Sequence, residues 1–319
     1  MVQEKNRPYG ERFIAVAQDP RYSPEASLRP AGDGRRDREH PVPAVKEQQL
    51  GVQQLAWFGF TSVLPMAWNV TAYQGDERLG ALTLAEGRGP VLEIRWRGGD
   101  PVQAERQLKH QIQRLERRGA SVERVESATN TYRVMLGGST VVLLARQRLF
   151  ELSWPRQPAA VETIVRSFSD QSHQVFWRWT LYGVDGVAPG RWSLRKINLL
   201  PGGSRLEFVR HSRRILLGSW SMAERLLNGH SLEQWAATTI PLVKNNPAGR
   251  WSSTGTTRTF NVPERRWFRG WRNMLGFRHN RQANCIVWFQ VEAPDTEERL
   301  FQVVAEGLVS PERPDHTSG

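Results

Sequence analysis

Short runs of alternating apolar and polar residues recur along most of the chain and predict β-strands. The first series of predicted strands covers 55–60, 69–73, 79–85, 91–96, 132–137, 139–146 and 148–154. Between the fourth and fifth strands, residues 102–118 place Leu108, Ile112 and Leu115 on one face of a helix that Gly119 ends. Gly137-Gly138 predicts a tight hairpin turn. A further helix is expected over 159–168.

The same order of signals returns in the second half of the chain. Strands are predicted over 175–182, 193–199, 205–210 and 213–220, and helices over 221–228, about 231–244 and 295–308. Individual residues repeat as well, and the three matched pairs are Trp68 with Trp192, Trp96 with Trp220, and Trp154 with Trp288. The first two pairs are both 124 positions apart, and Trp68 and Trp192 each end a Pro-x-x-Trp sequence. A period of this length indicates duplicated domains rather than a solenoid.

Because these six Trp residues match between the copies, we predict that they have a structural role in the sheets or cores, where an indole removes a large apolar area from water. The predicted fold class is α+β: two tandem α/β sandwich domains, each a mostly antiparallel sheet flanked by helices. The first copy covers 51–170 and the second 171–310. Residues 1–50, rich in Pro, Arg, Glu and Gln, are predicted to be a disordered arm, and 311–319 a short tail.

The element order, the Pro-x-x-Trp sequence and the EIRW strand at 93–96 make each copy resemble the PsbP/DcrB-like family. That family includes an extrinsic photosystem protein, Ran-binding import factors, bacterial DcrB-like proteins and the Eag-type chaperones of type VI secretion effectors. The resemblance implies a small antiparallel sheet flanked by helices, used for binding rather than catalysis. The chain departs from the family pattern in being a tandem and in carrying an insertion in its second copy.

Charge is distributed unevenly between the copies. The chain of 319 residues has 44 Lys and Arg against 32 Asp and Glu, a formal net charge of +12, and only five of the basic residues are Lys. Residues 171–319 hold 20 basic and 12 acidic residues, so this half contributes +8. The N-terminus has no apolar core of a secretory signal, and no apolar run is long enough for a transmembrane helix. We therefore expect a cytoplasmic protein.

Residue patterns that would indicate catalysis are absent from the sequence. It contains no phosphate-binding GxxxxGK[ST] or GxGxxG motif, no HExxH and no GxSxG. The seven His are scattered and Cys285 is the only Cys, which argues against a metal site and a disulfide framework and favours a small core residue. Glu93 and Glu151 are better explained as strand acids paired with Arg95 or Arg148 than as a catalytic pair. We predict no catalytic residue, no cofactor and no metal.

The most distinctive sequence is an Arg- and Trp-rich insertion at 263–282. The second copy reads NVPERRWFRGWRNMLGFRHNRQ at 261–282, where the first copy makes a connection with Gly137-Gly138 and a few residues. Placed on a helix, it has an apolar stripe and a basic face. The residues predicted to bind a partner are Arg265, Arg266, Trp267, Phe268, Arg269, Trp271, Arg272 and Phe277. Alternatively, the stripe covers the protein's own sheet or the junction between the copies.

Three ligands fit such a segment. Trp and Arg are the side chains that dominate protein interfaces. A basic amphipathic helix also suits an anionic membrane surface, and Arg with aromatic rings suits nucleic acid. The sequence therefore favours a non-enzymatic binding, adaptor or chaperone-like protein that holds a protein partner. The alternative is a peripheral binder of nucleic acid or anionic membrane.

Overall fold

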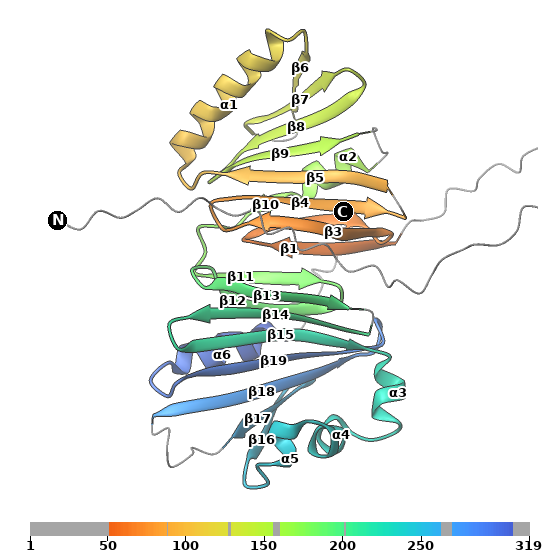
Figure 1. Cartoon of the computed structure of the whole chain (residues 1–319), viewed down its shortest axis with the longest axis vertical. Coiled ribbons are helices and arrows are strands. Elements are labelled where there is room, and N and C mark those ends of the chain that lie inside the picture. Colours follow the sequence, from red (N-terminus) through yellow and green to blue (C-terminus); the bar gives the residue numbers. More distant parts are fainter. Residues whose placement is uncertain are drawn as a thin grey trace, which may run out of the picture.

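The computed structural model describes residues 51–87, 89–126, 129–155, 160–200, 202–262 and 270–308. The predicted arm at 1–50 and the tail at 311–319 lie outside these residues. The described part consists mainly of antiparallel strands arranged in three sheets, with shorter helices beside them (Figure 1). Two of the sheets have seven strands each, and the third has five. The prediction of mostly antiparallel sheets with flanking helices is confirmed.

The first seven-stranded sheet comes from the first half of the chain. Its strands, in spatial order, are β3 (Trp68–Gly75), β4 (Leu79–Glu86), β5 (Gly89–Arg97), β9 (Leu149–Trp154), β8 (Ser139–Ala145), β7 (Thr131–Leu136) and β6 (Ser121–Arg124). Helix α1 (Pro101–Glu116) lies against β8 and β9 and confirms the helix predicted over 102–118. The Asp100 side chain caps it by accepting a hydrogen bond from the Val102 amide at 2.9 Å.

The second seven-stranded sheet has the same strand order. It runs β13 (Ser193–Leu200), β14 (Gly203–Arg210), β15 (Arg213–Ser221), β19 (Cys285–Pro294), β18 (Trp271–Asn280), β17 (Thr257–Val262) and β16 (Arg250–Thr254). Three short helices, α3 (Ala223–Leu227), α4 (Leu232–Thr239) and α5 (Pro241–Lys244), occupy the place of α1 in the chain. The repeated order of signals in the sequence is therefore repeated in the topology.

The third sheet joins the two halves. Its order is β10 (Ser169–Asp170), β2 (Phe60–Pro65), β1 (Val52–Trp57), β11 (Phe176–Leu181) and β12 (Val184–Pro189). Strands β1 and β11 pair antiparallel, with Ala56 opposite Thr180. The predicted picture of two separate sandwiches therefore needs correction, because both halves contribute strands to one central sheet. Whether either half folds alone stays a prediction.

Two matching hairpin turns show how closely the repeat is kept in this central sheet. Phe58-Gly59 connects β1 to β2, and Tyr182-Gly183 connects β11 to β12, 124 positions later. All four residues have positive φ, between 43° and 75°. This backbone conformation suits the twist of a two-residue hairpin but is unfavourable for the side chains of Phe58 and Tyr182. The Tyr182 hydroxyl donates to the Val70 carbonyl at 2.6 Å, so this turn also contacts the first seven-stranded sheet.

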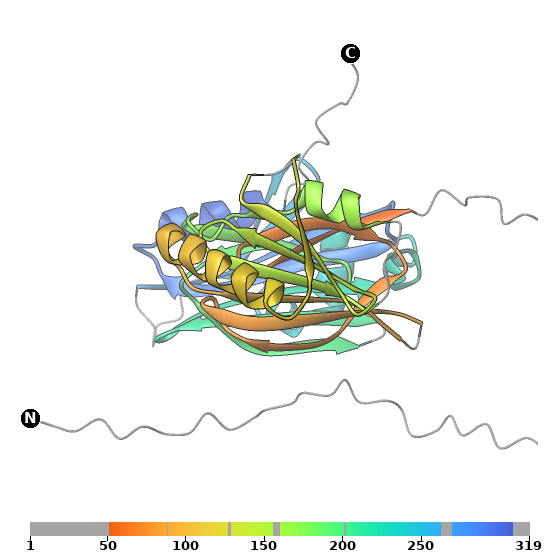
Figure 2. The same cartoon turned by 90° about the horizontal axis from the view of Figure 1, so that it is seen from above.

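One large apolar core extends through both halves. It contains residues from all three sheets, together with α2 (Val161–Ser167) and α6 (Glu298–Gly307). Within it, Trp57 and Trp179 contact each other edge to face across the β1–β11 pair. In the view along the long axis, α2 and α6 lie on the same side of the molecule (Figure 2). Smaller cores lie on the outer faces of the seven-stranded sheets, under α1 and under α3–α5.

The matched Trp residues are buried or half-buried, but only one pair occupies equivalent places. Trp68 and Trp192 both belong to the common core, as predicted. Trp96 also points into that core, whereas Trp220 lies on the opposite face of its sheet, against α4. The cause is a bulge in the first half, where the register between β4 and β5 shifts between Leu84 and Ala85. Because of this extra residue, Ser219, rather than Trp220, is the counterpart of Trp96. A shift of one residue along a strand moves a side chain to the opposite face of the sheet.

The third Trp pair differs in the same way. Trp154 belongs to the common core, whereas Trp288 belongs to the outer core under α3–α5. In the pairing of β9 and β19 with their neighbours, Leu152 opposes Ile94 and Phe289 opposes Leu217. Leu152 and Phe289 are therefore the equivalent residues, and Trp288 corresponds to Glu151. The predicted equivalence of Trp96 with Trp220 and of Trp154 with Trp288 is wrong, although all four side chains pack within the fold.

The predicted helix in the insertion is also corrected. Residues Trp271–Asn280 form β18, which pairs with β19 along its whole length and with β17 from Asn273 to Arg278. This strand is the counterpart of β8, so it belongs to the repeat rather than to an insertion. The extra sequence is the connection between Val262 and Trp271, which replaces the Gly137-Gly138 turn. The apolar residues over 271–278 have helical spacing and therefore predicted a helix. A strand that is buried on both faces also has apolar residues on both faces, so this pattern does not distinguish the two.

Candidate functional site

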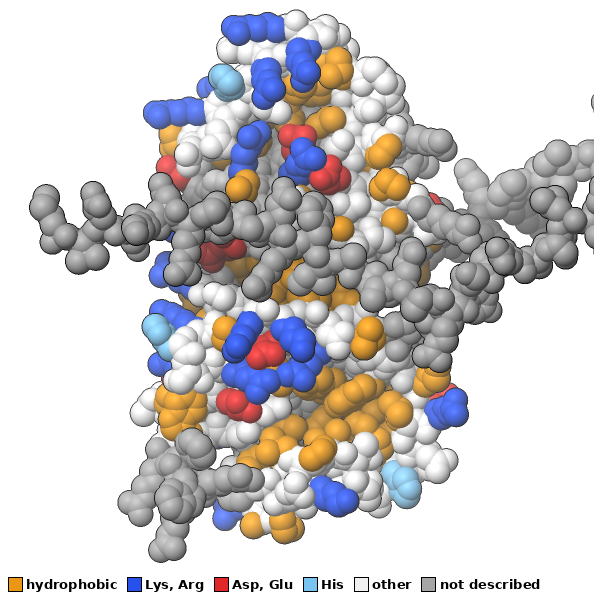
Figure 3. Space-filling model, in the orientation of Figure 1, with side chains coloured by type: hydrophobic (Ala, Val, Ile, Leu, Met, Phe, Trp, Pro, Cys, Tyr) orange, Lys and Arg blue, Asp and Glu red, His pale blue; other side chains and the backbone are white. Residues whose placement is uncertain are grey.

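The outer face of β13, β14 and β15 carries a charged groove. Figure 3 shows a group of Lys and Arg side chains around acidic ones in this region of the molecule. The groove is open to solvent and has a volume of about 520 Å³. Its lining residues are Arg195, Lys196, Glu207, Val209, His211, Ser212, Arg213, Arg214 and Glu292. Four cations against two carboxylates leave this lining with an excess of two positive charges.

Some of these charges neutralise one another. Arg214 lies between two acids, with its Nε 3.2 Å from Glu207 Oε1 and its Nη1 3.9 Å from Glu292 Oε2. Arg205 Nη2 is 3.5 Å from Glu207 Oε2. These contacts form a ladder across three adjacent strands. Each pair is partly exposed, so its contribution to stability is small.

Arg195 and Lys196 provide the available positive charge. Both side chains are exposed on β13, and neither forms an ion pair within the described residues. Strand β13 is the edge strand of its sheet, and its register shifts between Leu194 and Lys196. The first half has the matching bulge in β3, between Val70 and Ala72. The bulge is therefore part of the repeated fold, but the charge beside it is not.

The first half acts as an internal comparison for this surface. It builds the same strands in the same order, and the residues in register with the charged ladder are small or uncharged. Lys196, Arg205, Glu207 and Arg214 correspond to Ala72, Ala81, Thr83 and Pro90, respectively, by their cross-strand partners. Since the sheet forms without these charges in the first half, the fold itself does not require them. These charges are specific to the second half of the repeat.

Apolar surface adjoins the groove at the other end of the same strands. Leu200 at the end of β13 and Met222 after β15 are each 57% exposed, and Leu226 on α3 is 40% exposed. Between them, Trp220 stacks on Trp288 with ring centroids 4.9 Å apart. Figure 3 shows hydrophobic side chains beside the charged group. The second sheet thus presents cations and apolar side chains next to each other.

The residues predicted from the sequence as a docking site are not gathered on this surface. Arg265, Arg266, Trp267, Phe268 and Arg269 lie outside the described residues. Trp271 is half-buried at the start of β18. The remaining two positions, Arg272 and Phe277, are engaged within the fold.

Phe277 is completely buried in the outer core of the second half, so it has no surface to offer to a partner. Arg272 donates from Nε and Nη2 to Asn261 Oδ1 at 3.1 and 2.9 Å, and from Nη1 to Glu298 Oε2 at 2.7 Å. Its guanidinium also lies 4.7 Å from the centre of the Phe301 ring. Arg272 therefore fastens α6 to the sheet, and we remove it and Phe277 from the predicted docking residues.

The charged residues of the groove can be recognised in the sequence by comparing the two copies, although not from the overall composition. Comparing the two copies position by position shows cations at 196 and 205 where the first copy has Ala72 and Ala81. This difference lies inside predicted strands, at the spacing of 124 that the repeat supplies. The charge of the basic connection at 263–270 is contiguous in the sequence, whereas the charges of the groove are separated along the chain.

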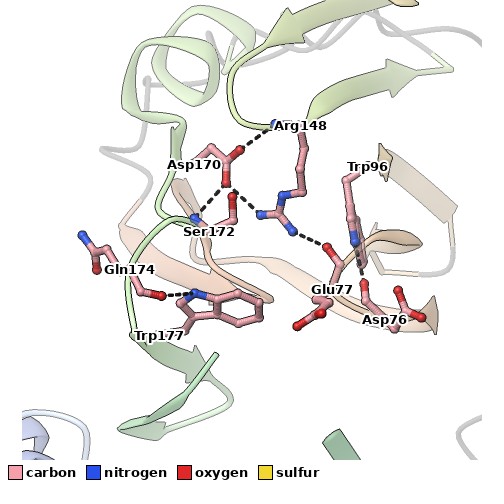
Figure 4. A network of polar contacts seen from close by, with 8 residues as sticks. All are labelled: Asp76, Glu77, Trp96, Arg148, Asp170, Ser172, Gln174 and Trp177. Atoms are coloured by element: carbon pink, nitrogen blue, oxygen red, sulfur yellow. Dashed lines mark hydrogen bonds and ion pairs between the residues drawn. The ribbon is translucent and has the colours of Figure 1, made fainter. Parts of the chain in front are cut away.

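A second polar network lies inside the molecule, at one end of the common core (Figure 4). Asp170 accepts hydrogen bonds from the Arg148 amide at 3.1 Å, from Arg148 Nη2 at 2.9 Å and from the Ser172 amide at 3.1 Å. Arg148 Nη1 donates to the Glu77 carbonyl at 2.9 Å. Burial lowers the pKa of Arg148, and the charge of Asp170 opposes this shift. The network joins three segments and has the character of a structural clamp.

The acidic residues considered in the sequence also have structural partners. Glu93 pairs with Arg95 at 3.0 Å, as expected, and Glu151 lies opposite Arg95 on β9. Arg148 pairs with Asp170 instead. Cys285 is buried, in agreement with its predicted place in the core, and burial raises the pKa of its thiol. Among the described residues, no three His, Cys, Asp or Glu side chains are grouped so that they could hold a metal ion.

No family model matches the chain, and no curated protein is similar to it. The resemblance to the PsbP/DcrB-like family therefore stays a prediction. None of the helices in the described ranges is long and apolar enough to cross a membrane.

Proposed function

We propose that this chain is a non-catalytic binding protein that holds a protein partner on the outer face of β13–β15. The supporting observation is the difference between the two halves. The same sheet carries Lys196 and Arg205 in one half, and Ala72 and Ala81 in the other. A charge that the fold does not need, placed beside exposed apolar side chains, suits a partner segment with both acidic and apolar residues.

The two parts of the surface have different roles in this proposal. Exposed ion pairs contribute about 0.2–1 kcal/mol each, so cations such as Arg195 and Lys196 mainly accelerate association and orient the partner. Leu200, Met222 and Leu226 provide apolar area whose burial supplies affinity, at about 25 cal/mol for each Å² removed from water. Because this charge is solvent-exposed, the proposed complex weakens as salt is added.

The tandem architecture belongs to the same proposal. Two PsbP/DcrB-like copies that share a central sheet form one rigid support, and the second copy carries the charged surface. A chaperone-like function, in which a hydrophobic or amphipathic segment of another protein is held, is consistent with that surface. The cytoplasmic location and the absence of catalysis remain expectations.

Charge reversal on β13 tests the proposal. The variant Arg195→Glu/Lys196→Glu changes two exposed side chains that form no ion pair within the described residues, so the sheet is expected to keep its stability. The matched control is Arg106→Glu/Lys109→Glu on α1, which makes the same change of charge at two exposed side chains of the first half that form no ion pair within the described residues. A labelled acidic amphipathic peptide serves as the probe, and its fluorescence anisotropy is measured at low and raised salt. We expect the β13 variant to bind at least about tenfold more weakly, about 1.4 kcal/mol, and the control to bind like the unmodified protein.

Two other ligands are measured in parallel. A single-stranded oligonucleotide and vesicles with anionic lipid address the alternative that the positive half binds nucleic acid or membrane. Tighter binding of either ligand than of the peptide contradicts the proposal of a protein partner. Equal loss of peptide binding in the β13 variant and the control also contradicts it, because the effect then follows net charge rather than the groove.

A further inference from the structure

The central sheet ends differently on its two sides. On the first-half side, β10 pairs with β2, so that Ser169 opposes Thr61 and Asp170 opposes Phe60. The next outward-facing amide of β2, that of Val63, donates to Ser167 Oγ at 2.9 Å. On the second-half side, β12 is the last strand, and no strand of the described ranges pairs with its outer edge. Val184 and Asp185 occupy the positions on β12 that Phe60 and Thr61 have on β2.

The open part of this edge is short. Helix α6 ends against β12, since a Cβ added to Gly307 would come within 2.5 Å of Val187 Cγ2. Within the described ranges, the stretch nearer the Tyr182-Gly183 turn has no neighbouring strand. The corresponding part of β2 is the part that β10 covers. Pairing there in the way that β10 pairs with β2 would involve a segment of about two residues.

The buried guanidinium of Arg278 lies beside Asp185, in the open part of the β12 edge. Arg278 on β18 is 4% exposed, and its Nη2 donates to Asp185 Oδ2 at 3.1 Å. Its Nε and Nη1 have no hydrogen-bond partner among the described residues. Thr257, directly opposite Arg278 on β17, is also buried, and its Oγ1 lacks a partner there as well.

The first half shows that these polar groups are not a requirement of the sheet. Leu144 has the place of Arg278, since it lies opposite Thr131 as Arg278 lies opposite Thr257. The Thr131 hydroxyl is used, because it donates to the Thr129 carbonyl at 3.1 Å and lies 3.2 Å from Arg146 Nη2. The second half has replaced an apolar side chain by a buried cation with unused donors.

The local charge is not balanced. Asp185 accepts two hydrogen bonds from Arg178, at 3.0 Å each, one from Arg278 and one from Thr180 Oγ1 at 3.3 Å. One carboxylate therefore serves two guanidinium groups, which leaves one positive charge. A buried donor without an acceptor is costly, and the cost is larger for a charged group. A second carboxylate is the group that best balances this charge, and Nη1, which Asp185 does not use, is the donor that it can accept from.

We propose that the outer edge of β12 binds an extended segment of a protein partner whose acidic side chain accepts a hydrogen bond from Nη1 of Arg278. The first half provides the template, because the strand added to β2 brings the carboxylate of Asp170 to Arg148. The site is separate from the groove on β13–β15, since it lies at the edge of the central sheet. Main-chain hydrogen bonds to β12 supply the binding mode, and the buried cation supplies the preference for an acid.

A peptide copied from the protein itself is the probe. The sequence of residues 168–172, Phe-Ser-Asp-Gln-Ser, is the segment that includes β10. The acetylated and amidated peptide is added to the full chain, and the Nε–H signal of Arg278 is followed by NMR. We expect a saturable shift of that signal and of the Asp185 amide. The same peptide with Asn in place of Asp is expected to bind at least about tenfold more weakly because it carries no charge.

The variant Arg278→Leu introduces the residue that the first half has at this place. Asp185 keeps its two bonds from Arg178, so the fold is expected to persist, and peptide binding is expected to disappear. The proposal is overturned if the Arg278 signal does not respond, if the Asn peptide binds equally well, or if the Leu variant keeps the binding.

A last comparison concerns the acids of the chain's own C-terminal sequence. In the full chain with Glu312→Gln and Asp315→Asn, we expect the Arg278 Nε–H signal to stay unchanged before peptide is added. A shift caused by these substitutions alone would show that the chain supplies its own carboxylate, and it would overturn the assignment to a partner.

Discussion

The clamp formed by Arg148 and Asp170 leads to a quantitative prediction for the variant Asp170→Ala. The side chains of the pair are 1% and 0% exposed, so water cannot replace the lost carboxylate. The substitution removes the acceptor of three hydrogen bonds and leaves the Arg148 guanidinium with the Glu77 carbonyl and the Phe150 ring, 5.0 Å away. Breaking a buried pair by removing one partner costs about 3–5 kcal/mol of unfolding free energy.

The double variant Arg148→Met/Asp170→Ala separates the cost of an unpaired charge from the value of the pair. Methionine keeps most of the side-chain volume of Arg148 and needs no partner. Two amides, those of Arg148 and Ser172, still lose their acceptor, which costs about 1–3 kcal/mol each when the amide stays buried. We therefore expect the double variant to be no less stable than Asp170→Ala alone, although it contains one more substitution.

Urea unfolding followed by Trp fluorescence and by circular dichroism measures both effects. The control is Glu162→Ala, which removes the exposed partner of Arg133, a glutamate that is 52% exposed. That change is expected to cost less than about 1 kcal/mol. The reasoning is refuted if Asp170→Ala costs no more than the control, or if the double variant is less stable than Asp170→Ala alone.

Three further predictions concern packing, a turn and pH. In Gly218→Ala the new Cβ would come within 2.3 Å of Trp288 Cε2, and we expect a loss of about 1–3 kcal/mol in urea unfolding together with a changed near-UV circular dichroism spectrum. Tyr182→Phe removes the hydrogen bond to the Val70 carbonyl and is expected to cost about 1 kcal/mol, and an unchanged urea midpoint would contradict that role. Burial raises the pKa of the Cys285 thiol, so the folded state holds this proton more tightly than the unfolded chain does. The resulting contribution to stability is complete below about pH 8.5 and is lost as the pH rises through the folded pKa. We expect Cys285→Ala to reduce this decline in urea midpoints measured across that pH range.

Much of the architecture could be predicted from local patterns. Alternation identified the strands around Trp68 and Trp192, helical spacing identified α1, and the repeated order of elements anticipated the repeated strand order of the two large sheets. These features depend on neighbouring residues, which a single sequence displays directly. The strand at Trp271–Asn280 was missed because a strand buried on both faces has no alternation to distinguish it from a helix.

The candidate sites were less accessible to prediction. The charged groove combines side chains from three strands, and Arg278 meets Asp185 although 93 residues separate them. Neither grouping is contiguous in the sequence, whereas the basic connection before β18 is. Composition therefore pointed to the contiguous cluster. Only the pairing of the strands shows that Lys196 stands where the first half has Ala72.

The amino-acid sequence by itself determined the order of many strands and helices, the Gly137-Gly138 turn and the duplication, because each is encoded by residues close together in the chain. The strand predicted over 55–60 was wrong, since Phe58-Gly59 is a turn between β1 and β2. The tertiary structure alone decided which face each Trp occupies, since one extra residue in β5, Val91, reverses the side chains that follow it in register. It also decided that the halves share a sheet. That choice depends on β1 meeting β11 across 124 positions, a contact that no local pattern specifies.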